Sequence, residues 1–244
     1  MTEFDLNLQA HLLLLCCAAS VAGFVRGFSG FGGPATISLL LAHLFAPATL
    51  LPKIIMLDFY AYPLLVWNAR KDANWRLSLP IAAVTVAMLP LGVHTMQSAD
   101  PATLKRMIAV ACLLAIAVNM SGYRLQRIPP LAVNLLVACV LGWALSATFI
   151  ALPMISYFLL MPMTATQCRA TVISFSITMT PFMVGYLIYR ETLQMGDVLP
   201  TAAAGACYFA MIWLGSRAFK RASDRNYRRG AQWLLLVLAT SVLL

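Results

Sequence analysis

Charged residues are scarce in this sequence. Only 10% of the 244 residues are Asp, Glu, Lys or Arg, whereas 61% are hydrophobic. A water-soluble domain usually has about 25% charged residues, so this composition excludes an ordinary soluble enzyme and a disordered chain. Lipid must cover much of the surface of such a protein. The sequence therefore predicts a polytopic membrane protein in contact with the lipid bilayer.

Acidic residues, histidines and cysteine motifs are also few or absent. Eight acidic residues stand against 17 basic ones, a charge of +9 that would suggest nucleic-acid binding in a soluble protein. In a membrane protein the basic residues orient the chain, so we expect no nucleic-acid partner. No two of the three histidines have metal-ligand spacing, and the six cysteines lie in apolar stretches without CxxC spacing. We therefore expect no metal and no cofactor.

Long charge-poor runs set the number of membrane segments, because a helix needs about 20 apolar residues to cross the hydrocarbon core. The run 128–168 would be about 60 Å long as one helix, so we count it as two segments that fold back on each other. The ten segments lie at 6–25, 27–52, 54–69, 77–96, 107–122, 128–168 (two), 170–189, 198–216 and 230–244. Strands of an outer-membrane barrel would alternate apolar and polar residues, which these runs do not. We expect an all-α fold of about 8–10 segments in one transmembrane domain, residues 1–244, with the first pair and the sixth and seventh as hairpins or broken helices.

Two halves of the sequence share an ordered set of positions. The first half supplies Lys53, Asp58-Phe59, Arg70, Pro80, Leu91-Gly92 and Lys105-Arg106, and the second supplies Arg169, Ser174-Phe175, Arg190, Pro200, Leu214-Gly215 and Arg228-Arg229. Their common order predicts a duplication, with repeat 1 at about 6–122 and repeat 2 at about 128–244. Five segments per half is an odd number, so the second repeat must be inverted relative to the first.

The distribution of basic residues predicts which side of the membrane each loop faces. Cytoplasmic loops carry an excess of Lys and Arg. Placing the N-terminus outside puts eleven basic residues inside and only Lys105, Arg106 and Arg190 clearly outside; the inside set is Arg70, Lys71, Arg76, Arg124, Arg127, Arg217, Lys220, Arg221, Arg225, Arg228 and Arg229. We therefore expect both termini outside.

A glycine-rich stretch at 23–34, GFVRGFSGFGGP, separates the first two segments. Each glycine weakens a helix by about 1 kcal/mol, so we expect the backbone to open around Gly30, Gly32 and Gly33. Free amide groups at a half-helix N-terminus attract anions, and Arg26 adds a full positive charge while Ser29 adds a hydroxyl donor. A simpler interpretation is that the small residues allow close helix packing and that Arg26 reaches out to lipid headgroups.

This stretch resembles a motif of the TauE/SafE family, the sulfite-exporter-like membrane proteins. The first repeat of that family typically carries G-x-x-x-G-x-x-G-x-G-G-G, which Gly23, Gly27, Gly30, Gly32 and Gly33 match, while Pro34 replaces the last glycine. The corresponding stretch of the second half, 137–153, has lost these glycines, which argues against a symmetric site. The resemblance implies export of sulfite, a sulfonate or a related small organic acid anion across a bacterial inner membrane.

Charges inside apolar segments predict further pathway residues, because an unpaired charge at membrane depth is costly. Lys53 and Arg169 occupy equivalent repeat positions and would contribute to one anion pathway. Asp58 is the one acidic residue placed well inside an apolar segment. It is either a proton-coupling carboxylate or the ion-pair partner of Lys53.

Hydroxyl groups recur at helical spacing after Arg169. Thr171 and Ser174 could donate to an oxyanion, and Ser174 is the repeat equivalent of Asp58. Alternatively, these hydroxyls bond back to carbonyl groups of their own helix.

Two other functions compete with transport. Gly27-Phe28-Ser29-Gly30 has the G-x-S-G form of rhomboid-type intramembrane serine proteases, which need a histidine base on a later helix. The last 150 residues contain no histidine, so we do not expect an enzyme. A non-transporting scaffold or assembly protein is the other alternative. Our hypothesis is an exporter of a small anion, with proton coupling and assembly into a homo-oligomer left open.

Overall fold

The computed structural model describes residues 3–41, 54, 57–59, 61–98, 100, 110, 113–114, 117–148, 151–189 and 198–243. Every regular element in these ranges is a helix, which confirms the all-helical class. The chain divides into two compact units, unit 1 (Met1–Trp67 and Val184–Ala222) and unit 2 (Asn68–Met183 and Ser223–Leu244). Each unit takes segments from both predicted repeats, and the inverted repeat within a single domain stays a prediction.

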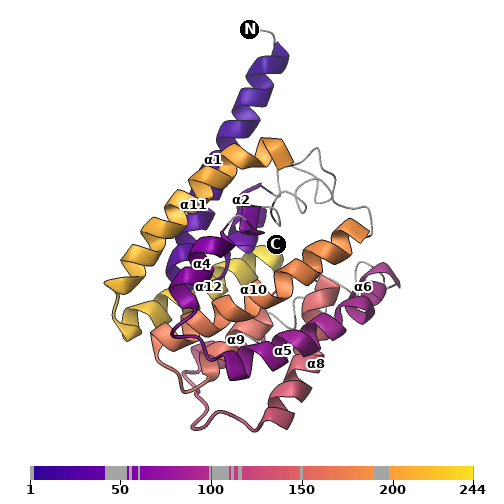
Figure 1. The fold of residues 1–244 in the computed structure, drawn as a ribbon, viewed down its shortest axis with the longest axis vertical. Helices are drawn as coiled ribbons and strands as arrows, with labels where there is room; N and C mark the ends of the chain where they lie inside the picture. The colour runs from indigo at the N-terminus through magenta and orange to yellow at the C-terminus, as the bar shows by residue number, and fades with distance from the viewer. Residues whose placement is uncertain are drawn as a thin grey trace. The chain divides into compact units, whose positions relative to one another are not determined.

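Unit 1 is organised around two long helices that lie side by side (Figure 1). These are α1 (Glu3–Ser29) and α11 (Val198–Lys220), which form the most extensive helix contact in the described chain. Unit 1 also contains α2 (Gly33–Leu41), which packs on α1, and most of α4 (Tyr62–Ala69).

Glycines set the distance between α1 and α11. A Cβ on Gly23 would lie 2.5 Å from the carbonyl oxygen of Tyr208, and one on Gly27 would overlap the carbonyl of Ile212. On the facing helix, a Cβ on Gly215 would overlap the carbonyl of Phe24. Small residues at such positions let two backbones approach closely, which is how helices associate in lipid, where no hydrophobic effect drives them together.

The first helix therefore ends later than the sequence suggests. The sequence placed the end of the first segment at residue 25, but α1 continues through Gly27 to Ser29. Packing against α11 compensates for the low helix propensity of Gly23 and Gly27. The break lies at Gly30 and Gly32, which have φ angles of 85° and 82°, in the left-handed region that glycine tolerates best.

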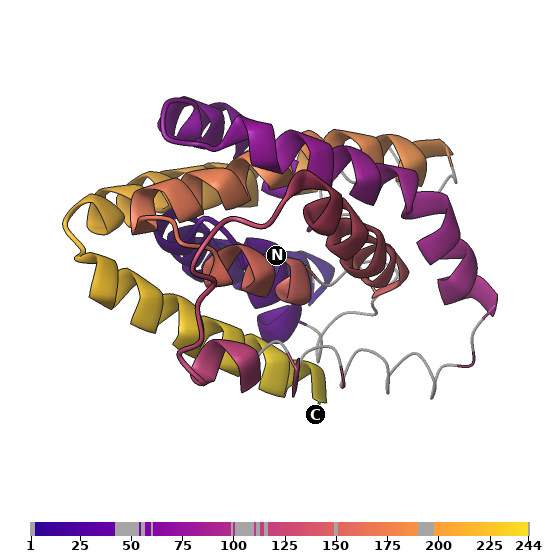
Figure 2. The ribbon, with the colours of Figure 1, turned by 90° about the horizontal axis from the view of Figure 1, so that it is seen from below.

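Unit 2 contains α8 (Leu131–Thr148), which packs against both α5 (Trp75–Ala87) and α6 (Leu89–Ser98). The α5 and α6 axes bend by 45° at Met88, and Figure 2 shows the change of direction. Pro90 follows the bend and lacks the N–H that a continuous helix would need. A Cβ on Gly92 would lie within 3 Å of the α8 backbone, and a Cβ on Gly142 would lie within 3 Å of the α5 backbone. Small residues therefore set the packing distance here as well.

The run 128–168 folds back, as its length requires. It forms α8, α9 (Leu152–Leu160) and the first turn of α10 (Ala165–Tyr189), and α9 packs on α8 and on α12 (Asp224–Leu243). Side-chain caps begin two of these helices. The Thr164 hydroxyl accepts a hydrogen bond from the Gln167 amide at 3.2 Å, and the Ser223 hydroxyl accepts one from the Asn226 amide at 3.2 Å.

Many exposed side chains on these helices are apolar. Val133, Leu136 and Val140 recur at helical spacing along α8, and Leu136 is 68% exposed. In the described part of the chain, α8 is the one helix long and apolar enough to cross a membrane alone, and α5 with Leu89–Met96 would make a second span if the bent pair counts as one. The predicted number of segments stays a prediction.

The glycine contact between α1 and α11 can be tested by Gly27→Ala. The added methyl group would overlap the Ile212 backbone, which cannot move as a side-chain end would. Overpacking of this kind usually costs about 1–3 kcal/mol. We expect a lower melting temperature of the purified protein in detergent.

The control is Gly185→Ala on α10, where a Cβ would have no neighbour within 4 Å. This variant should melt at the wild-type temperature or above it, because alanine favours the helix. Equal melting temperatures for both variants would show that Gly27 does not set the helix distance.

Candidate functional site

A buried ion pair joins two of the predicted site residues in unit 1. Nη2 of Arg26, on α1, lies 3.1 Å from Oδ2 of Asp58, and the two side chains are 4% and 7% exposed. Arg26 therefore does not extend to lipid headgroups. Each charge stabilises the other, and removal of either partner would leave an uncompensated buried charge.

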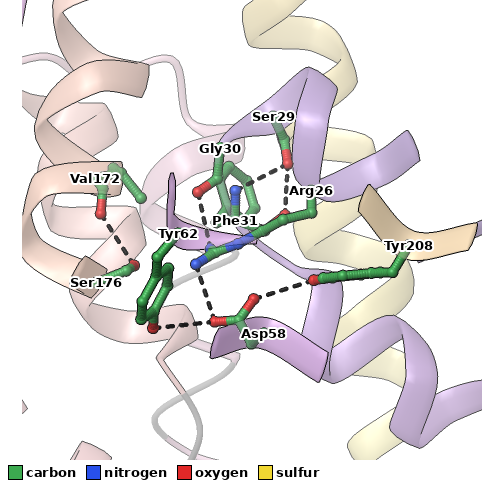
Figure 3. Close-up of polar contacts among 9 residues, drawn as sticks. All are labelled: Arg26, Ser29, Gly30, Phe31, Asp58, Tyr62, Val172, Ser176 and Tyr208. Atoms are coloured by element: carbon green, nitrogen blue, oxygen red, sulfur yellow. Dashed lines mark hydrogen bonds and ion pairs between the residues drawn. The ribbon is translucent and has the colours of Figure 1, made fainter. Parts of the chain in front are cut away.

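Two tyrosines complete the surroundings of the Asp58 carboxylate (Figure 3). The Tyr208 hydroxyl, on α11, donates to Oδ1 at 3.0 Å, and the Tyr62 hydroxyl lies 3.4 Å from Oδ2. Both carboxylate oxygens thus accept hydrogen bonds inside unit 1, as a buried carboxylate requires.

The guanidinium group of Arg26 connects this carboxylate to the glycine break. Nη1 donates to the Gly30 carbonyl at 2.9 Å while Nη2 donates to Asp58. Nε is buried and donates to no atom of the described residues. An unsatisfied buried donor usually costs about 1–3 kcal/mol, so this N–H is a group that an acceptor would stabilise.

Ser29 closes the turn between α1 and α2. Its hydroxyl oxygen lies 2.6 Å from the Phe31 carbonyl and accepts a hydrogen bond from the Phe31 amide at 3.2 Å. After the turn, the Thr36 amide and hydroxyl both donate to the Gly32 carbonyl, at 2.8 Å and 2.7 Å. The opened backbone is therefore a defined turn, fixed by its own side chains.

Gly33 makes room for the Asp58 site. A Cβ at this position would overlap the Tyr208 hydroxyl, so any larger residue would displace the tyrosine from Asp58. The predicted residues Arg26, Ser29, Gly30, Gly32 and Gly33 thus lie together with Asp58 in unit 1. Lys53, the predicted partner of Asp58, lies outside the described residues.

The remaining predicted residues lie in unit 2, on α10. Arg169 is 5% exposed, and Thr171 and Ser174 are fully buried. The Thr171 hydroxyl donates to the Gln167 carbonyl at 2.7 Å and accepts a hydrogen bond from the Asn74 amide at 3.1 Å. Ser174 lies 2.8 Å from the Thr171 carbonyl and 2.7 Å from the Ser78 hydroxyl.

Hydroxyls further along α10 also contact their own helix. Ser176 donates to the Val172 carbonyl at 3.0 Å, as Figure 3 shows, and Thr178 donates to the Ser174 carbonyl at 2.9 Å. These hydroxyls therefore follow the alternative given above, in which they bond back to carbonyl groups of their own helix. A role for these hydroxyls in binding an anion stays a prediction.

A family model described as Sulfite exporter TauE/SafE matches residues 15–242. The chain belongs to the TauE/SafE family. Neither the curated proteins nor the solved structures contain a match to it.

Membership in the TauE/SafE family makes the chain an integral membrane transporter. The match covers nearly the whole chain, including the glycine turn, Asp58 and α11. It thus includes every described residue that forms the buried cluster in unit 1.

Two members of this cluster, Tyr62 and Tyr208, were not predicted from the sequence as site residues. Tyr62 lies four residues after Asp58, a spacing that places both on one helix face and could have indicated the contact. Tyr208 lies 150 positions after Asp58 in an apolar segment, and no local pattern connects the two. Only the packing of α11 on α1 brings it to the site.

Tyr208→Phe tests the hydrogen bond to Asp58. The change keeps the ring but leaves Oδ1 of a buried carboxylate without its donor, which typically costs about 1–3 kcal/mol. We expect a clear decrease in melting temperature. Tyr189→Phe removes a hydroxyl from a side chain that is 81% exposed and should leave the melting temperature unchanged. If Tyr208→Phe melts like Tyr189→Phe, the hydrogen bond does not stabilise the site.

Proposed function

We propose that this protein exports a small sulfur-containing anion, such as sulfite, a sulfonate or a related organic acid, across the bacterial inner membrane. The family description, Sulfite exporter TauE/SafE, supports this substrate class and direction. The observation in unit 1 that carries the proposal is the buried guanidinium of Arg26, which lies against the glycine turn and whose Nε–H finds no acceptor among the described residues.

This arrangement suits an anion that must bind and then leave. Asp58 neutralises Arg26 in the resting site, so an arriving anion shares the guanidinium with a carboxylate instead of meeting a bare positive charge. Transport requires binding that is favourable enough for entry and weak enough for release. A guanidinium already paired to a carboxylate satisfies both conditions better than an isolated one.

The glycine turn supports the same role. Because Gly30 and Gly32 have no side chains, an anion can approach the backbone of the turn closely. The turn also leads into the N-terminus of α2, whose helix dipole favours negative charge. Arg26 and the start of α2 would therefore attract an anion to the same place.

The membrane potential favours export. A cytoplasm that is negative by 100 mV drives each negative charge outward with about 2.3 kcal/mol. Efflux of an anion can therefore proceed without coupling to another ion. In this account Asp58 holds Arg26 in place; proton coupling through Asp58 is the alternative, and it would be needed for uptake.

Lys53 and Arg169 remain proposed contributors to the pathway. Both follow a predicted hairpin, and a second and third positive charge would keep the anion stable along its route. Thr171 and Ser174 would donate hydrogen bonds there. We also propose that both termini face outward, as the basic residues indicate.

The role of Arg26 can be tested without leaving a buried charge unpaired. Arg26→Gln alone would strand the Asp58 carboxylate and destabilise the fold. The double variant Arg26→Gln with Asp58→Asn removes both charges together, so it should insert and fold. We expect its sulfite efflux from proteoliposomes to fall by about 10- to 100-fold, the effect of losing one charge-assisted hydrogen bond to the anion.

Asp58→Asn alone is the second variant. It keeps Arg26 but leaves the buried guanidinium without its counter-charge, so its melting temperature is measured and its efflux is compared per folded protein. If Asp58 only positions Arg26, this variant should retain measurable efflux with an unchanged response to a pH gradient. Loss of a pH response that the wild type has would assign proton coupling to Asp58. Wild-type efflux in the double variant would refute the assignment of Arg26 as the anion site.

A further inference from the structure

A basic cavity lies within unit 2, and its lining contains none of the residues assigned to the transport site above. Its volume is about 620 Å³, and it is lined by residues from the loop before α8, from the loop before α10 and from the first turns of α12. Four guanidinium groups and one carboxylate contribute to the lining, from Arg124, Arg225, Arg228, Arg229 and Asp224. The lining therefore carries three net positive charges.

Two of these side chains are held by the fold. Asp224 accepts a hydrogen bond from the Ala165 amide at 3.3 Å and so caps the start of α10. Arg228 donates to the Leu159 carbonyl at 3.3 Å and to the Met163 carbonyl. Carbonyl groups do not neutralise a guanidinium, so the positive charge of Arg228 is fixed at the cavity wall.

The other three arginines, Arg124, Arg225 and Arg229, are exposed, and no acidic side chain in the described part of the chain forms an ion pair with them. The pKa of Arg124 is lowered, first by partial desolvation of its guanidinium and then by the positive charge of Arg228, although Asp224 acts in the opposite direction. Arginine stays protonated in proteins, so the crowding leaves a strongly positive cavity.

The shape and the walls of the cavity indicate the size of its ligand. Its volume lies in the range of about 300–1,000 Å³ that is typical of sites for whole small molecules. A sulfite-sized anion would fill only a small part of it. Leu125, Pro162 and Met163 add apolar walls beside the arginines, so the cavity suits a charged group attached to an apolar body.

We propose that this cavity binds the phosphate group of an anionic phosphate ester. Guanidinium groups match the geometry of phosphate oxygens and can bind them in a bidentate manner. In a membrane protein, basic pockets at the ends of helices are suited to phospholipid headgroups, whose glycerol part would contact the apolar walls. A soluble phosphate ester has the same chemistry, and the experiment below separates the two sources. The proposal does not depend on the transport function.

The test is ligand binding by the purified full-length protein, measured by native mass spectrometry in detergent. One arm titrates phosphatidylglycerol and cardiolipin, with zwitterionic phosphatidylethanolamine as the reference lipid. The other arm titrates inorganic phosphate and glycerol 3-phosphate. Each arm compares the wild type with Arg225→Gln/Arg229→Gln, which removes two charges from the cavity.

The matched control is Arg76→Gln/Arg221→Gln, which removes two exposed arginines outside the cavity. We expect the affinity for the anionic ligand to fall about 30-fold in the cavity variant, as roughly 1 kcal/mol for each arginine implies, and to stay near the wild-type value in the control. Arg124→Gln, a single change in a loop, should give a smaller loss in the same direction.

The two arms decide the source of the phosphate. Arginine-dependent binding in the lipid arm alone identifies a phospholipid headgroup, and arginine-dependent binding in the soluble arm identifies a free phosphate ester. Either result supports the phosphate site. The proposal is overturned if no anionic lipid binds more tightly than phosphatidylethanolamine and no soluble phosphate binds. It is also overturned if the cavity variant and the control lose affinity equally.

Discussion

Unit 1 depends on two opposite charges that are buried against each other. Arg26 and Asp58 lie 3.1 Å apart with almost no exposure, and neither could remain charged in an apolar interior without the other. Hydrogen bonds stabilise both ends of the pair. Arg26 donates to the Gly30 carbonyl, and the Tyr208 hydroxyl donates to Asp58. A buried ion pair seldom adds net stability, and a fixed positive charge here fits the proposed role of Arg26 in binding the anion.

The close approach of α1 and α11 makes this pair possible. Gly23, Gly27 and Gly215 remove side chains from the contact, and α11 can then present Tyr208 to Asp58. Gly33 leaves space for the tyrosine hydroxyl itself. The glycine motif thus has two functions along its length, with its first glycines allowing helix packing and its later ones opening the turn beside Arg26.

The sequence predicts the helices well and the contacts between them poorly. The fold-back of 128–168 follows from helix length alone, and the break near Gly30 follows from helix propensity. The extension of α1 to Ser29 could not be predicted, because the gain from packing Gly27 against α11 is tertiary. For the same reason Asp58 could be recognised as a buried charge in need of a partner, but its pairing with Arg26, 32 positions away, depends on which helices meet.

We propose that this member of the TauE/SafE family moves small anions down the membrane potential. The most direct measurement is efflux of sulfite, sulfoacetate, taurine and acetate from proteoliposomes containing the wild-type protein, with the membrane potential clamped and the pH gradient varied separately. We expect efflux of a sulfur-containing anion that increases with an inside-negative potential and does not require a pH gradient. Absence of flux for every anion under both gradients would contradict the account and favour a scaffold function.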